Sequence, residues 1–176
     1  MRIKRRDFIS LSGRLSIGFA GINMLPPFNP GLVKRRNPNK VTVDNAVAKL
    51  EDGSLLEIPF WRIDSGSDGP SLLLIAAQRG NEVQGTEVAR RFSEICSSRL
   101  INGTVWLIPM ANLLAVHRKR HSINLGPEDP IEKARDEGYN MNLIWPGRPD
   151  GNDTERLAYA LDQSVLRHCT HSVDIH

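Results

Sequence analysis

The feature that most limits what this chain can fold into is a run of six apolar residues, 72–77, that ends at once in a polar turn. The run lies between a Gly- and Ser-rich segment at 65–70 and Gly80. Its length and composition predict a strand buried on both faces, which is typical of the parallel sheets of α/β proteins. Because such folds bind ligands at the carboxyl ends of their strands, Glu82 beyond the turn is a candidate functional residue.

The other patterns along the chain alternate between strands and helices. Apolar alternation, turn residues and helical spacing predict strands at 41–50, 55–63, 104–108 and 173–176, and helices at 85–99 and from Asp153 or Thr154 onward. The first two strands flank an Asp-Gly turn and should form a β-hairpin. Residues 109–152 show no periodicity and are expected to be irregular. This order predicts an α/β fold with a mostly parallel sheet and helices on its faces.

The charge of the chain is divided unevenly. Residues 1–40 contain nine Lys and Arg side chains and one acidic residue, Asp7, whereas the whole chain has a formal net charge of +3. The part after residue 40 is therefore acidic. Because a nucleic-acid-binding surface must be basic to neutralise phosphates, nucleic acid is not expected as a partner.

The first 25 residues have the order of a bacterial twin-arginine export signal. The pair Arg5-Arg6 is followed by Phe8 and a weakly apolar, Gly-containing stretch. Arg14 interrupts this stretch, which is too short to cross a bilayer, so no stable membrane span is expected. We expect the twin-arginine export machinery as a partner and a periplasmic location. The alternative is an ordinary basic N-terminal tail.

The domain boundaries follow from these composition changes. Residues 1–25 are expected to be the signal segment, and residues 26–40, rich in Pro, Asn and basic side chains, a linker. The folded domain should occupy residues 41–176.

Three motifs, at 79–82, 140–147 and 174–176, together resemble the succinylglutamate desuccinylase/aspartoacylase family, which is related to the zinc carboxypeptidases. They read Arg-Gly-Asn-Glu, Asn-Met-Asn-Leu-Ile-Trp-Pro-Gly and Asp-Ile-His. The family has His-Gly-x-Glu, Asp/Asn-x-Asn-Arg-x-Phe/Trp-Pro-Gly and Asp-Leu-His at these places. The resemblance covers about residues 41–176. It implies a zinc-carboxypeptidase-like three-layer αβα fold with a mixed, mostly parallel sheet, truncated to its N-terminal part and preceded by the hairpin.

The resemblance also implies a function, that of a zinc-dependent hydrolase that deacylates a small acylated amino-acid-like substrate through metal-activated water. Glu82 and His176 match two of the three zinc ligands of the family. Asn142 matches the Asn of an Asn-Arg pair that helps to hold the substrate's carboxylate, and Arg120 is a candidate to line the substrate cleft. The family's catalytic Glu lies further along its domain, so no catalytic residue is expected in this chain.

Two positions depart from the family pattern. Arg79 stands where the family has its first zinc ligand, and a guanidinium has no lone pair to donate. Leu143 stands where the family has the carboxylate-binding Arg. These changes favour an alternative, a truncated or degenerate non-catalytic member without bound zinc. An exported metal-free binding module that uses the same cleft is a further alternative. Gln78 should point to the opposite side of the strand and is not counted as a ligand.

Several candidate residues also have a structural interpretation. Glu82 could cap the helix expected from Gly85. His168 and His171 could form a metal pair, but near a helix end they more commonly meet terminal carbonyls or solvent. The basic segment 117–121 is expected to be a solvated loop, and the loop around Trp145 is expected to be anchored by its buried ring.

The two cysteines, Cys96 and Cys169, are compatible with either a disulfide or two buried thiols. A disulfide is permitted in an exported protein, but it requires the two positions to lie within bonding distance. Buried free thiols are the interpretation that we favour.

Overall fold

The computed structural model describes residues 39–123, 128–130, 133 and 139–176. These residues belong to one compact unit, Asn37–His176. The expected signal segment at 1–25 and the expected linker up to residue 38 lie outside the described residues, and both stay predictions. In the described ranges, no helix is long and apolar enough to cross a membrane.

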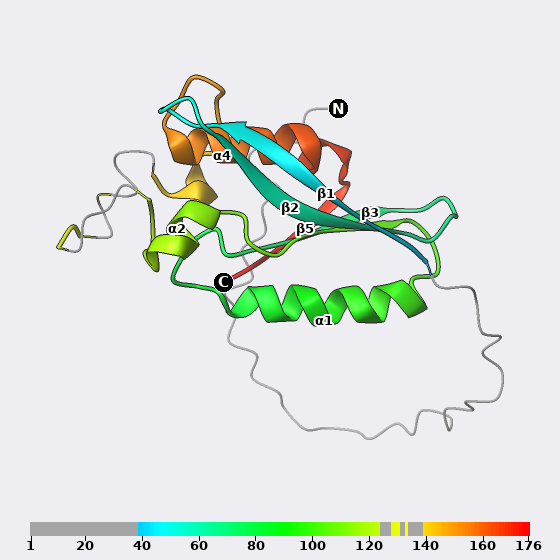
Figure 1. Ribbon diagram of the computed structural model, residues 1–176. Helices are drawn as coiled ribbons and strands as arrows, with labels where there is room; N and C mark the ends of the chain where they lie inside the picture. The colour runs from blue at the N-terminus through cyan, green and yellow to red at the C-terminus, as the bar shows by residue number, and fades with distance from the viewer. Residues whose placement is uncertain (1–38, 124–127, 131–132, 134–138) are drawn as a thin grey trace, which may run out of the picture. The chain divides into compact units, whose positions relative to one another are not determined.

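The centre of the fold is a five-stranded mixed sheet in the order β1-β2-β4-β3-β5 (Figure 1). The strands are β1 Lys40–Lys49, β2 Leu55–Asp64, β3 Ser71–Ala76, β4 Thr104–Ile108 and β5 His171–Ile175. β3 pairs in parallel with β4 and β5, whereas β2 pairs antiparallel with β1 and β4. The expected hairpin, β1 and β2, is confirmed. The carboxyl ends of β3, β4 and β5 consequently meet at one edge of the sheet.

Helices cover both faces of the sheet. Helix α1, Gln84–Arg99, lies on one face and helix α4, Asp153–Ser164, on the other (Figure 1). Shorter helical segments are α2 Leu113–Arg118, η2 Met141–Leu143 and η3 Leu166–His168. The three-layer αβα arrangement expected from the sequence is therefore confirmed.

The side chains of β3 pack into two hydrophobic clusters, one on each face of the sheet. Leu73 and Ile75 point to the side of α4 and pack in a cluster with Leu157 and Leu161. Leu74 points to the other side and packs in a cluster that contains Ala89 of α1. Alternate side chains of a strand face opposite sides of a sheet, so a strand buried on both faces must be apolar throughout, as this run is.

Two local features of the chain differ from the sequence prediction. Residues 113–118 form α2, whereas the sequence predicts an irregular stretch. The sequence gives no signal for this helix, because six residues are too few to show a helical period. Asn152 caps α4, rather than Asp153 or Thr154. The Asn152 side chain accepts from the backbone of Glu155, and the Glu155 carboxylate accepts from the backbone of Asn152. This reciprocal pair is a capping box, which satisfies two N–H groups at the helix start.

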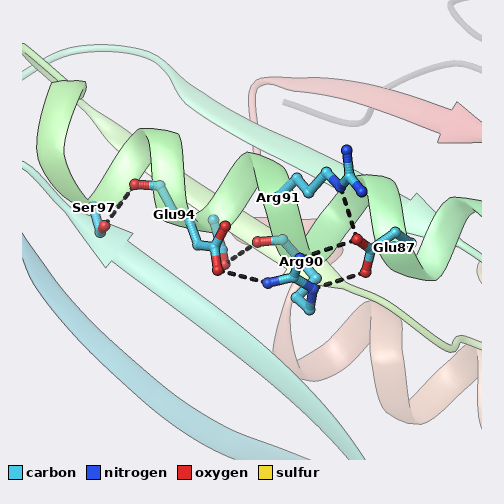
Figure 2. Close-up of polar contacts among 6 residues, drawn as sticks. Glu87, Arg90, Arg91, Glu94 and Ser97 are labelled. Atoms are coloured by element: carbon cyan, nitrogen blue, oxygen red, sulfur yellow. Dashed lines mark hydrogen bonds and ion pairs between the residues drawn. The ribbon is translucent and has the colours of Figure 1, made fainter.

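The outer face of α1 is a solvated, charged surface (Figure 2). Arg90 donates to Glu87 and Glu94, and Arg91 donates to Glu87. Hydrogen bonds from the two arginines lower the pKa of Glu87 to about 2. These side chains are between 49% and 72% exposed, so their ion pairs are screened by water and contribute little to stability.

The two cysteines are buried free thiols, as the sequence analysis favoured. Cys96 belongs to the core cluster beneath α1, and Cys169 belongs to the cluster beneath α4. The sheet separates the two clusters, so the thiols cannot meet in the folded state. Burial raises the pKa of the Cys169 thiol to about 11, and it raises the pKa of the Cys96 thiol as well.

We expect Cys169 to resist alkylation in the folded protein. Only the thiolate reacts, and a rise of the pKa from 9 to about 11 lowers its fraction at pH 8 by about 100-fold, before burial slows access further. Iodoacetamide labelling of a Cys96→Ser variant, followed by mass spectrometry in buffer and in urea, measures this. Equal labelling rates in the two solutions would contradict the burial of the thiol.

Candidate functional site

The polar turn after β3, residues 77–83, is called the elbow below. Ala77 has a positive φ of 51°, a left-handed conformation that costs a non-Gly residue about 1 kcal/mol. Asn112, fully buried at the start of α2, holds this conformation. Its backbone N–H donates to the Ala77 carbonyl, and its side chain donates to the Gln78 carbonyl at 3.2 Å. The elbow is therefore shaped by the segment that follows β4.

Gly80 lets the elbow approach α2 closely. A Cβ atom at this position would lie 2.0 Å from the backbone carbonyl carbon of Ala115. No side chain fits there. The close approach places Arg79 and Glu82 together at the edge of the sheet where β3 ends.

Gln78 faces away from this group of side chains, as expected. Its side chain is 2% exposed, and its Oε1 accepts from the indole N–H of Trp145 at 2.8 Å. Trp145 also packs against the core cluster beneath α4. The loop around Trp145 is therefore anchored by its indole ring. The Gln78 side chain contributes to this anchor and not to the group around Glu82.

Glu82 does not cap α1, so that structural interpretation is wrong. The N-cap residue of α1 is Val83, and no side chain accepts from the helix start. The two Glu82 oxygens instead accept from Arg79 Nη1 at 2.8 Å and face His176 Nδ1 at 2.7 Å. The carboxylate is turned toward the end of β5, where Figure 1 shows the C-terminus close to the start of α1.

His176 joins two carboxylates. Its Nδ1 faces Glu82, and its Nε2 lies 2.7 Å from Asp174 Oδ2 and 3.1 Å from Asn142 Nδ2. Because ionised carboxylates only accept, a ring that bonds both of them must donate from both nitrogens. Turning the Asn142 amide by 180° would let its oxygen share the Nε2 proton. The structure thus brings together three of the predicted site residues, Glu82, Asn142 and His176.

The electrostatic balance at Glu82 favours its charged form. Partial burial raises the pKa of Glu82, but the hydrogen bonds from Arg79 and His176 and their charges outweigh it, so the pKa lies below its usual range. Arg79 and Glu82 are only 30% and 26% exposed. The pair is therefore less screened than the ion pairs on α1.

His121 is a candidate residue that the sequence analysis missed. It was assigned to a solvated loop, but it is partly buried, and its Nδ1 is covered without a hydrogen-bond partner. Burial lowers the pKa of His121, the charge of Arg79 lowers it further, and the charge of Glu82 raises it. Its neighbour Arg120, the predicted cleft residue, lies in the turn after α2, where its backbone N–H donates to Ala115.

The two other histidines near a helix end have other contacts. The His168 ring stacks on Trp106, with 5.9 Å between the ring centroids. His171 Nδ1 lies 2.9 Å from the Thr170 hydroxyl. Each of these two histidine rings therefore contacts a neighbouring side chain.

Zinc does not fit the residues present at this site. Glu82 and His176 could both turn toward a metal ion, but the third position holds Arg79, whose guanidinium is hydrogen-bonded to Glu82. Across the described part of the chain, no group of three or more His, Cys, Asp or Glu side chains could hold a metal ion. A cation at this place would also meet the positive charge of Arg79.

The fold defines the class of the domain, which is an α/β domain with a carboxypeptidase-like fold. Carboxypeptidase A of Helicoverpa armigera shares the fold, with a TM-score of 0.52 and 16% identity over 78% of this chain and 41% of that one. The succinylglutamate desuccinylase/aspartoacylase catalytic domain matches residues 68–176. This chain belongs to that family, as the three motifs predicted.

Individual relatives agree with the family. An aspartoacylase family protein of Mesorhizobium loti is 28% identical, with a TM-score of 0.66, over 79% of this chain and 40% of that chain. The product-bound ectoine utilization protein EutE (DoeB) of Ruegeria pomeroyi is 25% identical, with a TM-score of 0.57, over 80% of this chain and 44% of that chain. The N-alpha-acetyl-L-2,4-diaminobutyric acid deacetylase of Halomonas elongata is 26% identical over 138 residues, 71% of this chain and 37% of its own length. The chain thus spans about two fifths of the length of these relatives.

Proposed function

We propose that this protein derives from deacylases that hydrolyse small acylated amino acids, and that it keeps their ligand site without the zinc ion. The ligand would be a small acylated amino acid bound where β3 and β5 end. The 2.8 Å ion pair between Arg79 and Glu82 carries the proposal. It pairs Glu82, which matches a zinc ligand of the family, with a positive charge from the chain itself. Glu82, Asn142 and His176 would then act as polar groups that contact the ligand.

A zinc-dependent deacylase is the second candidate. Asp174 accepts from His176, and a histidine that ligates a metal usually donates its other N–H to a carboxylate in this way. For this activity the Arg79 guanidinium would have to move away from Glu82, and another side chain would have to supply the third zinc ligand. The acetylated compound in the name of the Halomonas elongata relative is a suitable probe for both candidates.

The decisive experiment measures zinc and ligand binding on the same sample. The protein is purified without chelator, dialysed, and analysed for zinc by mass spectrometry, and N-alpha-acetyl-L-2,4-diaminobutyric acid is then titrated in while NMR spectra are recorded. We expect no stoichiometric zinc, saturable shifts from the titration and no release of acetate. Stoichiometric zinc that is lost in Glu82→Ala, together with acetate release, would establish the second candidate instead.

A further inference from the structure

Strand β1 leaves one side of the sheet open. It is an outer strand (Figure 1), and within the described residues it pairs only with β2. Its ten residues contain no proline, and its pairing with β2 runs from Lys40 to Lys49 without a bulge. Natural edge strands are commonly short, bulged or interrupted by proline, because an unpaired edge is a template for another strand. β1 has none of these three protections.

The open side of β1 presents the backbone groups of its odd-numbered residues. Leu50, just after β1, donates its backbone N–H to Ser54 across the hairpin, so this N–H points toward the β2 side. The direction of the backbone groups alternates along an antiparallel strand. The N–H and carbonyl groups of Val41 and Val43 therefore point to the open edge, where a further strand could bond them.

The open edge is also apolar on one face. Val41 and Val43 are 49% and 65% exposed, and Val43 stands opposite Trp61 of β2. These three side chains line a cavity of about 280 Å³ together with residues of α1, which are Ser93, Glu94 and Ser97. Exposed apolar side chains beside an unpaired backbone edge favour association with another strand.

The charges of β1 are complementary to those of a second copy of the same strand. If two copies pair antiparallel about Thr42, Lys40 of each copy lies opposite Asp44 of the other, and Val41 lies opposite Val43. Opposite charges at directly opposed positions stabilise a strand pair. A pairing centred on Asp44 would instead oppose the two Asp44 carboxylates, which is destabilising. The register about Thr42 is the one that places Lys40 opposite an acidic residue of β1.

We propose that β1 pairs with β1 of a second copy of this chain, antiparallel and centred on Thr42, to form a two-fold symmetric dimer. The same five residues of each copy, 40–44, form the interface, as two-fold symmetry requires. The two sheets become one continuous sheet, and both copies of α1 lie on the same face of it. The valines of each copy then continue the apolar strip of the other. This inference does not rest on the proposed function, because it concerns a different edge of the sheet.

The experiment measures the mass of the full 176-residue chain by analytical ultracentrifugation over a range of concentrations. We expect a species of twice the 19.7 kDa chain mass that dissociates on dilution. Lys40→Glu and Asp44→Lys should each raise the dissociation constant by about 10-fold or more, because each turns two attractive pairs into two repulsive ones. An equimolar mixture of the two variants should dimerise again, since opposite charges then meet at both pairs.

Lys49→Glu is the matched control, because it reverses a charge on the same strand outside the five paired positions, and it should leave the dissociation constant unchanged. Circular dichroism identifies any variant that fails to fold. A second measurement needs no variant: amide hydrogen exchange at Val41 and Val43 in the original chain should slow as its concentration rises.

Three results would overturn the inference. The first is a monomer at every concentration. The second is a dimer that both folded charge variants keep, because another surface would then join the copies. The third is a mixture of the two folded variants that stays monomeric. If a variant does not fold, hydrogen exchange decides, and rates at Val41 and Val43 that do not change with concentration overturn the pairing of β1.

Discussion

Arg79→His is expected to give this chain a zinc site, with one zinc ion bound per chain and an affinity more than about 100-fold above that of the original sequence. The estimate exceeds the 10- to 100-fold that changes outside the ligand shell produce, because this substitution adds a ligand outright. It also removes a positive charge from the position of a dication. Zinc prefers three protein ligands from His and carboxylate groups in sites that keep a fourth position open. The measurement is a zinc titration against a competing chelator of known affinity.

Two controls separate the new ligand from the lost charge. Arg79→Gln removes the guanidinium without adding an imidazole and should bind little zinc. Glu82→Ala in the Arg79→His background should abolish the new binding, because Glu82 faces both residue 79 and His176. If Arg79→His bound no more zinc than Arg79→Gln, the elbow would not present residue 79 to the other two ligands.

Gly80→Ala is expected to lower the free energy of unfolding by about 3 kcal/mol or more. The added Cβ would lie 2.0 to 2.3 Å from backbone atoms of Ala115 and Val116. Overpacking against a flexible side chain can relax by a rotation, but backbone atoms of α2 move only with the helix. Urea denaturation followed by circular dichroism measures the change, provided that the slope with denaturant stays constant.

Gly66→Ala is the matched control for Gly80→Ala. Gly66 has a φ of +71°, and no atom lies within 4 Å of the position that a Cβ would take. An alanine there is therefore destabilised only by the left-handed backbone conformation. That cost is about 1 kcal/mol. If both substitutions cost the same, crowding against α2 would not explain Gly80, and the close approach of the elbow to α2 would be in error.

These two predictions concern neighbouring residues with different roles. Gly80 allows the elbow to pack against α2, and this packing sets where the side chains of Arg79 and Glu82 lie. If both predictions hold, Arg79 determines whether that place binds a metal ion or holds an internal ion pair. Gly80 would then maintain the fold of the family, and residue 79 would set the chemistry of its site.

Much of the fold could be predicted because its signals are local. The apolar run at 72–77, the Asp-Gly turn and the helical spacing over 85–99 each reflect burial of one face or both, and each was confirmed. α2 could not be predicted, because a helix this short depends on Asn112 at its start and on contacts with the elbow. The cap of α4 was misplaced by one residue, since Asn152, Asp153 and Thr154 are all good caps and the choice depends on Glu155.

The residue types of the site were determined by the sequence alone. Arg79, Glu82, Asn142 and His176 stand at motif positions, and the chemistry of a guanidinium excludes it as a metal ligand in any fold. Only the tertiary structure decided which partners these side chains have. The ion pair of Arg79 with Glu82, the contact of Glu82 with His176 and the burial of His121 depend on how β3, β5 and the turn after α2 meet. Such contacts join residues up to 94 positions apart, and no local periodicity records them, because they arise from the packing of the whole sheet edge.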